Sequence, residues 1–440
     1  MVSNLKNKVE MKKILTLLIL TLLCVGVFAQ DSEFLQKLKG LKGVSDVEVL
    51  QSNVFKEKYV IYFTQNIDHK NPQKGTFKQR VIVGFRGFDS PTVLVTEGYT
   101  ASYATYPYYR EELAELYNAN IVFVEHRYFA KSVPEPTDWN FMTVENSAND
   151  LHNIRQTFGQ IFPKKWVATG ISKGGSTCTY YRAFFPNDVD ATVAYVAPIS
   201  RGVVDGRHEK FLLKKVGTKE ERDKVHDCQV EFMKRKDKLV SMLDTFSTNH
   251  NYKYYIPLSD VYDYLVLEYE FSLWQWGTPV STIPSKGESD AVWFNYLAEM
   301  VGPDYFAYPS EHLPFFYQAL RELGYYGYPL KYIKKYTDLK DSKNYVKNIM
   351  VPAEMRNVEF DKTVCKFTEN YLKNNDPTLI FIYGENDPWT ASGVAGWLNC
   401  KKKQNMAVYV QPRGSHLSRI SNMPADMKKQ ITDKLDKWLK

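Results

Sequence analysis

The first half of the chain alternates between short, wholly apolar runs and amphipathic segments. Apolar runs of strand length are "TVLVTEG" (Thr92 to Gly98), "NIVFVEHRYF" (Asn120 to Phe129), "WVATGIS" (Trp166 to Ser172) and "ATVAYVAPIS" (Ala191 to Ser200). Between them, "YYREELAELYNA", "ENSANDLHNIRQTF" and "GGSTCTYYRAFF" carry apolar residues at helical spacing. Buried strands that alternate with helices indicate a mostly parallel sheet covered on both faces. We therefore predict an α/β fold.

Both ends of the chain extend this pattern. "YVIYFTQ" (Tyr59 to Gln65) and "QRVIVGF" (Gln79 to Phe85) flank a turn-rich segment, as an antiparallel pair would. The alternation stops near Gly202 and resumes with "TLIFIYGENDPW" and "AVYVQPRGSH" before a polar helix. We predict one α/β catalytic domain of residues 30–201 and 376–440. A mainly helical lid, residues 202–375, would interrupt it and cover the carboxyl ends of the strands.

The N-terminal residues have the layout of a secretory signal peptide. Met11-Lys12-Lys13 precedes an apolar run from Ile14 to Phe28, and small residues follow at a plausible cleavage site. The run is short for a membrane anchor, which needs about 20 apolar residues. Leu23 is too large for the lipidation box that Cys24 suggests. We expect residues 1–29 to be removed, leaving a secreted or periplasmic protein without a stable membrane anchor.

Charge and cysteine content argue against a nucleic-acid partner and a zinc site. The net charge is +7, from 57 Lys+Arg against 50 Asp+Glu, and the basic residues lie mostly among acids. This charge pattern predicts a solvated surface rather than a nucleic-acid partner. Beyond the signal region, Cys178, Cys228, Cys365 and Cys400 allow one or two disulfides of undetermined pairing, and Cys178 fits a buried free thiol equally well. No cysteine or histidine spacing suggests zinc, so we expect no metal site. The serine acyl transfer inferred below needs no cofactor, and none is expected.

"GISKG" carries the candidate chemistry. Ser172 stands where a predicted strand turns into a helix, between Gly170 and Gly174, as at a nucleophile elbow. Asp387 in "GENDPW" and His416 in "RGSH" each follow a later strand, in the Ser-Asp-His order of α/β hydrolases. His416 would take the Ser172 proton, and Asp387 would orient the imidazole. Glu385 is a rival acid that lies less far into the loop.

A serine nucleophile also needs two backbone N–H donors for the tetrahedral oxyanion. The first is expected at Lys173, directly after Ser172. The second is expected in the loop after "TVLVTEG", at Tyr99 or its neighbour Gly98. Glu125 and Arg127 end a strand near the same face, where a substrate could touch them, and we interpret them as a buried structural ion pair. His69 is interpreted as structural.

Several motifs together resemble the secreted tripeptidyl aminopeptidase family of serine peptidases, related to lysosomal Pro-X carboxypeptidase and dipeptidyl peptidase II. The similar segments are "FTQNIDHKNPQKGTFKQR", "VEHRYFAKSVP", "GISKGG", "LEYEFSLWQWG", "FFYQALRELGYYGY", "GENDPW" and "GSHLSRI", and Lys173 resembles the tripeptidyl branch. The resemblance implies an α/β-hydrolase fold and an exopeptidase that releases short peptides from free N-termini, with proline preferred before the cut in several members.

Such an enzyme needs a negative group for the α-ammonium of the substrate. The candidates are Glu268 and Glu270 in the predicted lid and Glu97 in "TEGYT". Trp274 and Trp276 are candidates for a wall against proline, although all five residues also fit an ordinary structural role. The expected partners are peptides with free N-termini, and the oligomeric state is left open.

Three other functions remain compatible with the sequence. A Pro-X carboxypeptidase or a dipeptidyl peptidase would use the same scaffold, and the former needs a cation for the substrate carboxylate. A lipase or carboxylesterase is a second class, because the fold does not fix the substrate. A binding protein without catalysis is the third, and the presence of all three triad candidates argues against it.

Overall fold

The computed structural model describes residues 31–440, and the predicted signal peptide lies outside them. The chain divides at Lys42 into two units, which are described separately. In the first unit, α2 (Glu33–Lys39) begins after Ser32, whose hydroxyl accepts a hydrogen bond from the Leu35 N–H at 3.1 Å. The second unit, residues 43–440, contains the sheet and the candidate site.

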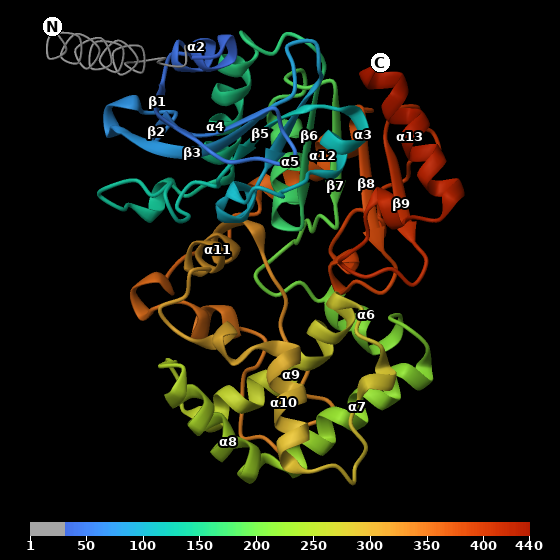
Figure 1. Ribbon diagram of the computed structural model, residues 1–440. Helices are drawn as coiled ribbons and strands as arrows, with labels where there is room; N and C mark the ends of the chain where they lie inside the picture. The colour runs from blue at the N-terminus through green and yellow to red at the C-terminus, as the bar shows by residue number, and fades with distance from the viewer. Residues whose placement is uncertain (1–30) are drawn as a thin grey trace, which may run out of the picture. The chain divides into compact units, whose positions relative to one another are not determined.

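Within residues 43–440, nine strands form one sheet in the order β1-β2-β3-β5-β4-β6-β7-β8-β9 (Figure 1). They are β1 (Val44–Val49), β2 (Glu57–Asn66), β3 (Thr76–Phe85), β4 (Thr92–Thr96), β5 (Asn120–Val124), β6 (Trp166–Ile171), β7 (Ala191–Tyr195), β8 (Leu379–Gly384) and β9 (Ala407–Gln411). The strands from β5 to β9 run parallel, whereas β1, β2 and β3 pair antiparallel with their neighbours. The predicted α/β-hydrolase fold is confirmed.

Helices cover both faces of the sheet, and the alternation of side chains along β4 shows how. Val93 joins the apolar cluster that includes Leu113 and Leu435, while Thr96 points to the other face and donates a hydrogen bond from its hydroxyl to Gly174 O at 2.9 Å. The first face carries α3 (Glu112–Tyr117) and α13 (Ala425–Leu439), and the second carries α4 (Val144–Phe158) and α5 (Lys173–Phe184). These predominantly apolar strands are buried on both sides, as their sequence predicts.

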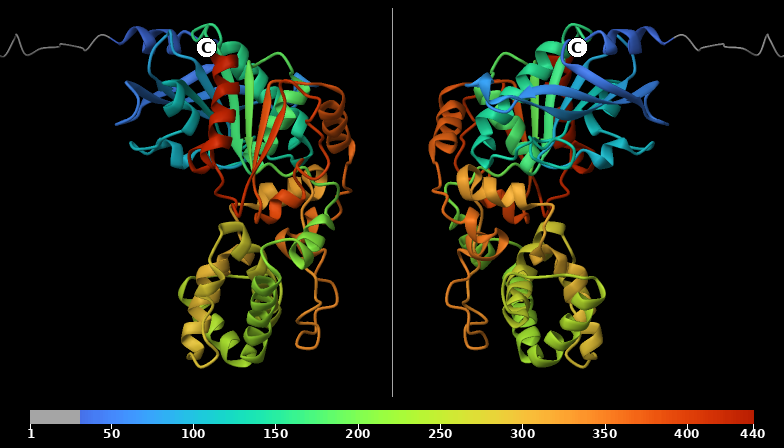
Figure 2. Two further views of the ribbon diagram at one scale, coloured as in Figure 1. Left: turned by 90° about the vertical axis from the view of Figure 1, so that its right-hand side faces the viewer. Right: turned by 90° about the vertical axis from the view of Figure 1, so that its left-hand side faces the viewer.

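Between β7 and β8 the chain forms a group of helices beyond one end of the sheet (Figures 1 and 2). They are α6 (Arg207–Lys214), α7 (Lys219–Lys234), α8 (Lys236–Asn249), α9 (Leu258–Trp276), α10 (Asp290–Val301) and α11 (Leu313–Gln318). The central helix α9 packs against α7, α8 and α10, and it is therefore buried around most of its circumference. Phe232 and Trp293, edge to face with ring centroids 5.3 Å apart, belong to this core.

Two elements differ from the sequence expectation. Strand β1 was not predicted, because none of its side chains is buried and it carries no apolar pattern. Helix α12 (Thr363–Asn374), within the segment expected to form the lid, packs on α5 instead, with the rings of Phe184 and Phe367 4.8 Å apart. The lid boundaries at residues 202 and 375 stay a prediction.

The four cysteines of the described chain are all free thiols. Cys178, Cys228 and Cys365 are buried, and Cys400 is partly buried. Of the sequence alternatives, the buried free thiol at Cys178 is the one observed. No helix among residues 31–440 combines the length and apolar character that crossing a membrane requires.

Candidate active site

Ser172 lies on the turn between β6 and α5. Its backbone has φ 57° and ψ −121°, a region that non-glycine residues rarely adopt. The turn is tight because strand and helix nearly touch: a Cβ on Gly170 would lie 2.3 Å from the backbone of Gly174. The Ser172 N–H donates to Tyr195 O at 2.9 Å, which fixes the turn to the neighbouring strand. The hydroxyl is thereby held at the positive end of α5.

Asp387 and His416 are paired in loops that follow β8 and β9. His416 Nδ1 lies 2.8 Å from Asp387 Oδ2, and both side chains are buried. The other oxygen, Asp387 Oδ1, accepts the Trp389 N–H at 3.0 Å, so the carboxylate is held from two sides. Glu385, the rival acid, instead accepts the N–H of Arg413 at 2.7 Å. Asp387 is therefore the acid that contacts the histidine.

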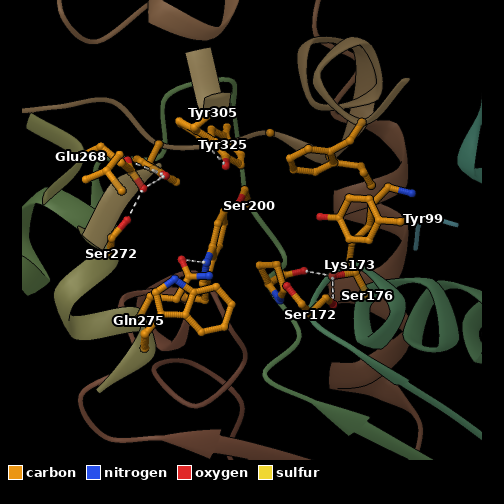
Figure 3. A pocket seen from close by; sticks show the side chains of 18 of the residues that line it. Tyr99, Ser172, Lys173, Ser176, Ser200, Glu268, Ser272, Gln275, Tyr305 and Tyr325 are labelled. Carbon is orange, nitrogen blue, oxygen red and sulfur yellow. Dashed lines mark hydrogen bonds between the residues drawn. The ribbon is translucent and has the colours of Figure 1, made fainter. Parts of the chain in front are cut away.

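A cavity of about 220 Å³ opens beside Ser172, between the sheet and the helical group. Figure 3 shows Ser172, Lys173 and Tyr99 on one side of it, and Glu268, Ser272 and Gln275 on the other. Its lining is mostly aromatic and hydroxyl-bearing: Tyr99, Ser172, Lys173, Ser176, Tyr180, Pro198, Ser200, Glu268, Ser272, Gln275, Trp276, Val301, Tyr305, Phe315, Leu323, Gly324, Tyr325, Tyr326 and Trp389.

His416 adjoins the wall of this cavity. Its ring centroid lies 6.1 Å from that of Trp276 and 6.5 Å from that of Trp389, and both tryptophans line the cavity. The His416 N–H also donates to Gln275 O, in the last turn of α9, at 2.9 Å. The histidine loop is thus hydrogen-bonded directly to the helical group.

Glu268 is the acidic residue of the cavity. Its carboxylate, 5% exposed, accepts hydrogen bonds from the hydroxyls of Tyr328 at 2.7 Å, Tyr326 at 2.9 Å and Ser272 at 3.1 Å. Burial raises its pKa to about 7, although these hydroxyls oppose the shift. Among residues 31–440, no Lys, Arg or His side chain forms a salt bridge with Glu268. It is a buried carboxylate with hydroxyl partners and no cation.

The other candidate substrate residues are placed differently. Glu270, two residues along α9, faces away from the cavity and pairs with His226 Nε2 at 3.0 Å. Trp274 is buried in the helical core, where a Cβ on Gly217 would lie 2.5 Å from its ring. Trp276 lines the cavity and is 49% exposed. Of these three residues, only Trp276 shares the cavity with Ser172.

Glu97 is bound to the loop after β4 rather than facing the cavity. Its carboxylate accepts the Tyr103 hydroxyl at 2.6 Å and the Tyr99 N–H at 3.2 Å. Burial raises its pKa, which hydrogen bonds and the charge of Lys173 counteract. This loop also carries the two candidates for the second oxyanion donor. A Cβ on Gly98 would lie 2.7 Å from Lys173 Cβ, so only glycine permits this approach.

Glu125 and Arg127 are both buried and ion-paired, in line with the structural interpretation, but they do not pair with each other. Glu125 pairs with Arg80, and both the Nε and Nη2 of Arg127 donate to Asp150 at 2.7 Å. Both residues lie beyond the end of β5 at Val124, so the regular alternation of a strand does not set the directions of their side chains. Asp150 also contacts His69 Nε2 at 2.7 Å, in line with a structural role for that histidine.

Sequence reasoning missed the residues that surround Glu268. Tyr325, Tyr326 and Tyr328 come from one segment, "GYYGY", and the Tyr305 and Tyr325 hydroxyls are hydrogen-bonded at 3.0 Å. The density of tyrosines in this segment was the available signal. Among residues 31–440, no group of three or more His, Cys, Asp or Glu side chains is arranged to hold a metal ion.

A serine on a strained strand-to-helix turn and a buried Asp-His pair thus adjoin one cavity. In a comparison with protein families, residues 30–440 match PS-10 peptidase S37. The chain belongs to this family. It is a serine peptidase, and the resemblance inferred from its motifs is confirmed.

Curated relatives agree with this assignment. The prolyl tri/tetrapeptidyl aminopeptidase of Streptomyces mobaraensis is 30% identical over 391 residues, covering 86% of this chain and 79% of the relative. Lysosomal Pro-X carboxypeptidase from Homo sapiens is 29% identical over 164 residues, about a third of each chain (33% and 33%). The similarity to the aminopeptidase therefore covers far more of this chain than the similarity to the carboxypeptidase does.

Solved structures of more distant proteins also resemble the chain. VinJ is 14% identical with a TM-score of 0.41, and the match covers 90% of this chain and 99% of VinJ. The peroxisomal α/β-hydrolase Lpx1 of Saccharomyces cerevisiae is 13% identical with a TM-score of 0.42, covering 88% of this chain and 90% of Lpx1.

Proposed function

We propose that this serine peptidase is a secreted exopeptidase that releases tripeptides from free N-termini, with proline preferred before the cut. Ser172, His416 and Asp387 would carry the chemistry. The proposal is supported by the family, by the similarity to the prolyl tri/tetrapeptidyl aminopeptidase of Streptomyces mobaraensis and, above all, by the position of Glu268 in the cavity beside Ser172.

In the proposed mechanism, Ser172 attacks the carbonyl carbon of the third residue while His416 takes the hydroxyl proton. The 2.8 Å contact with Asp387 would hold the imidazole with Nε2 as the base and stabilise the imidazolium. The N–H groups of Lys173 and Tyr99 would bind the oxyanion. His416 then returns the proton to the leaving amine, and water hydrolyses the acyl-enzyme.

Glu268 carries the assignment to N-termini. A substrate that acylates Ser172 places its N-terminal part in the adjoining cavity, where a carboxylate without a cationic partner meets the α-ammonium. Attraction between opposite charges is stronger at a buried carboxylate such as Glu268 than in bulk water. The rings of Tyr305 and Tyr326 line the same cavity and would add cation–π stabilisation.

The charge of the cavity argues against a Pro-X carboxypeptidase. Among the described residues that line the cavity, one carries a carboxylate, Glu268, and one carries an amine, Lys173. The Lys173 Nζ already donates to Gly98 O at 2.6 Å. A substrate carboxylate would therefore meet the buried Glu268 and no free cation. Trp276 and Tyr99 offer flat aromatic walls on which a proline ring can pack.

The deciding experiment compares fluorogenic amides of Ala-Ala-Pro, Ala-Pro and Pro, each with a free and an acetylated N-terminus. We expect turnover of free Ala-Ala-Pro amide by the wild type and none by Ser172→Ala. Equal turnover of the acetylated tripeptide would overturn the role of the α-ammonium. Hydrolysis of nitrophenyl esters without any peptide would indicate an esterase instead.

Export is part of the proposal and has its own test. The pattern of residues 11–29 supports it, and the family match begins at residue 30. N-terminal sequencing of the protein recovered outside the cytoplasm should find a start near Gln30. A protein that keeps residues 14–28 would contradict cleavage.

A further inference from the structure

The side chain of Lys173 is buried directly behind the candidate nucleophile. It is 4% exposed, and its ammonium donates to Gly98 O at 2.6 Å. The same ammonium lies over the rings of Tyr99 and Phe129, 5.5 and 5.3 Å from their centroids. Within residues 31–440 it has no carboxylate partner at salt-bridge distance.

Such a group is costly for the fold. A buried ammonium loses its hydration, and burial accordingly lowers the pKa of Lys173 well below its usual value, although the charge of Glu97 opposes this. An apolar side chain of similar length would fill the space without that penalty. Stability alone therefore does not explain a lysine at this position.

The acceptor of the lysine identifies its role. The Gly98 carbonyl and the Tyr99 N–H belong to one planar peptide unit, and in a trans peptide they point in opposite directions. A donor that fixes the carbonyl therefore also fixes the direction of the N–H. The N–H of this unit is the second oxyanion donor in the proposed mechanism.

The two ends of this peptide unit are held unequally. The Lys173 contact at the carbonyl is short, at 2.6 Å. The contact of the Tyr99 N–H with Glu97 Oε1 is 3.2 Å, at the long end of the range for such bonds. The N–H can therefore give up Glu97 more readily than the carbonyl gives up Lys173.

We propose that the Lys173 side chain is a positioning residue that orients the Gly98–Tyr99 peptide so that its N–H meets the oxyanion. The ammonium acts from behind, through the carbonyl, and also polarises the peptide so that its N–H donates more strongly. Lys173 thus serves the oxyanion twice, through its own backbone N–H and through the peptide that its side chain holds. The inference rests on the proposed function only in taking Tyr99 as a donor.

The test removes the ammonium and keeps the backbone, with Lys173→Met as the variant and Lys58→Met as its matched control. Lys58 is 1% exposed, and its ammonium donates to Tyr106 O at 2.8 Å and lies 5.7 Å from the Tyr109 ring centroid. It reproduces the burial, the carbonyl acceptor and the aromatic contact without touching the Gly98–Tyr99 peptide.

We expect Lys173→Met to lower kcat by about tenfold to a hundredfold, less than the loss of a whole oxyanion donor. The Kd of an uncleaved peptide, measured in a Ser172→Ala background, should not change. Lys58→Met should keep kcat within about twofold of the wild type, even if its Tm changes as much as the Tm of Lys173→Met. A purely structural lysine would not separate kcat from Kd in this way.

Nitrophenyl acetate is the first substrate, because its turnover needs the nucleophile and the oxyanion hole but no N-terminal recognition. Turnover of the ester without cleavage of peptides would refute the proposed function and still test Lys173. If Lys173→Met does not fold, Lys173→Leu, which also lacks a donor for the Gly98 carbonyl, replaces it. Unchanged kcat in the folded variant, or an equal loss in Lys58→Met, would overturn the proposal.

Discussion

Asp387 and His416 meet at 2.8 Å between Oδ2 and Nδ1, and the histidine backbone is simultaneously hydrogen-bonded to Gln275 in the helical group. His416 is thus held by hydrogen bonds to its ring and to its main chain. This arrangement leads to predictions that separate the reacting groups from the residues that shape the cavity.

Replacing Ser172 with Ala should abolish turnover. Without the hydroxyl no acyl-enzyme forms, and kcat should fall by about 10⁶-fold, as for loss of a serine nucleophile elsewhere. Reaction with a fluorophosphonate probe, followed by intact mass, should label the wild type once and the variant not at all. Labelling of the variant would place the nucleophile elsewhere.

Asp387→Asn should lower kcat by about 10⁴-fold, because an asparagine favours the wrong imidazole tautomer. The matched control is Glu385→Gln, two residues earlier, whose carboxylate contacts the Arg413 N–H and not the histidine. That variant should stay within about threefold of the wild type in kcat. The reverse order of effects would make Glu385 the acid.

Glu268→Gln should raise KM for peptides with free N-termini by about tenfold to a hundredfold, the range for a lost hydrogen bond to a charged group. Nitrophenyl ester turnover should be unaffected. Glu270→Gln is the control, because its side chain contacts His226 outside the cavity. An equal effect on acetylated and free peptides would show that Glu268 does not bind the α-ammonium.

The pH dependence of KM should follow Glu268, whose pKa burial raises to about 7. Below that value the carboxyl is neutral, so KM for free peptides should rise as the pH falls. Above about pH 8 the substrate amine loses its proton, and KM should rise again. A KM that stays constant between pH 5 and 7, measured with the free tripeptide amide, would contradict the assignment.

The same carboxyl makes stability depend on pH. Its folded pKa lies above its usual 4.5, so the folded state holds the proton more tightly. The stabilisation is fully present below pH 4.5 and is lost as the pH rises through about 7, on the order of 3 kcal/mol in total. Thermal unfolding of Glu268→Gln should lack this component, and an unchanged profile would refute it.

Trp274→Ala and Trp276→Ala should affect different properties. Trp274 is buried in the helical core, and its truncation should cost about 3–5 kcal/mol of unfolding free energy. Trp276 is half exposed in the cavity wall, so its loss should cost less than about 1 kcal/mol but raise KM for proline-containing peptides. Chemical denaturation and kinetics on the same preparations separate the two effects.

The sheet was predictable because its strands are buried on both faces and therefore predominantly apolar. Strand β1 was not, since its exposed side chains give no such signal. Ser172, Asp387 and His416 could be singled out because each follows a parallel strand, and the carboxyl ends of parallel strands lie at one edge. The ion-pair partners of Glu125 and Arg127 could not be predicted from the sequence, because tertiary packing brings Arg80 and Asp150 to them.

The positions of the candidate substrate residues were only partly predictable from the sequence. Glu268 and Glu270, like Trp274 and Trp276, are two apart, and two helical positions differ by about 200°, so one member of each pair must face away. Helical geometry alone therefore limits the cavity to one of each. Which one lines the cavity depends on how α9 packs, and that is set by helices remote in sequence.

The hydrogen bond between the His416 N–H and Gln275 O has a consequence for redesigning this enzyme. In the proposed mechanism, the helical group would set specificity and the loops at the end of the sheet would carry the reactive side chains. The hydrogen bond from the His416 N–H to Gln275 O connects the two at the proposed base. A helical group transplanted from a relative would have to place the carbonyl at the end of α9 where Gln275 O lies, or His416 would shift. Selection for new substrates is therefore freer along the far wall, near Glu268 and the tyrosines, than at this hydrogen bond.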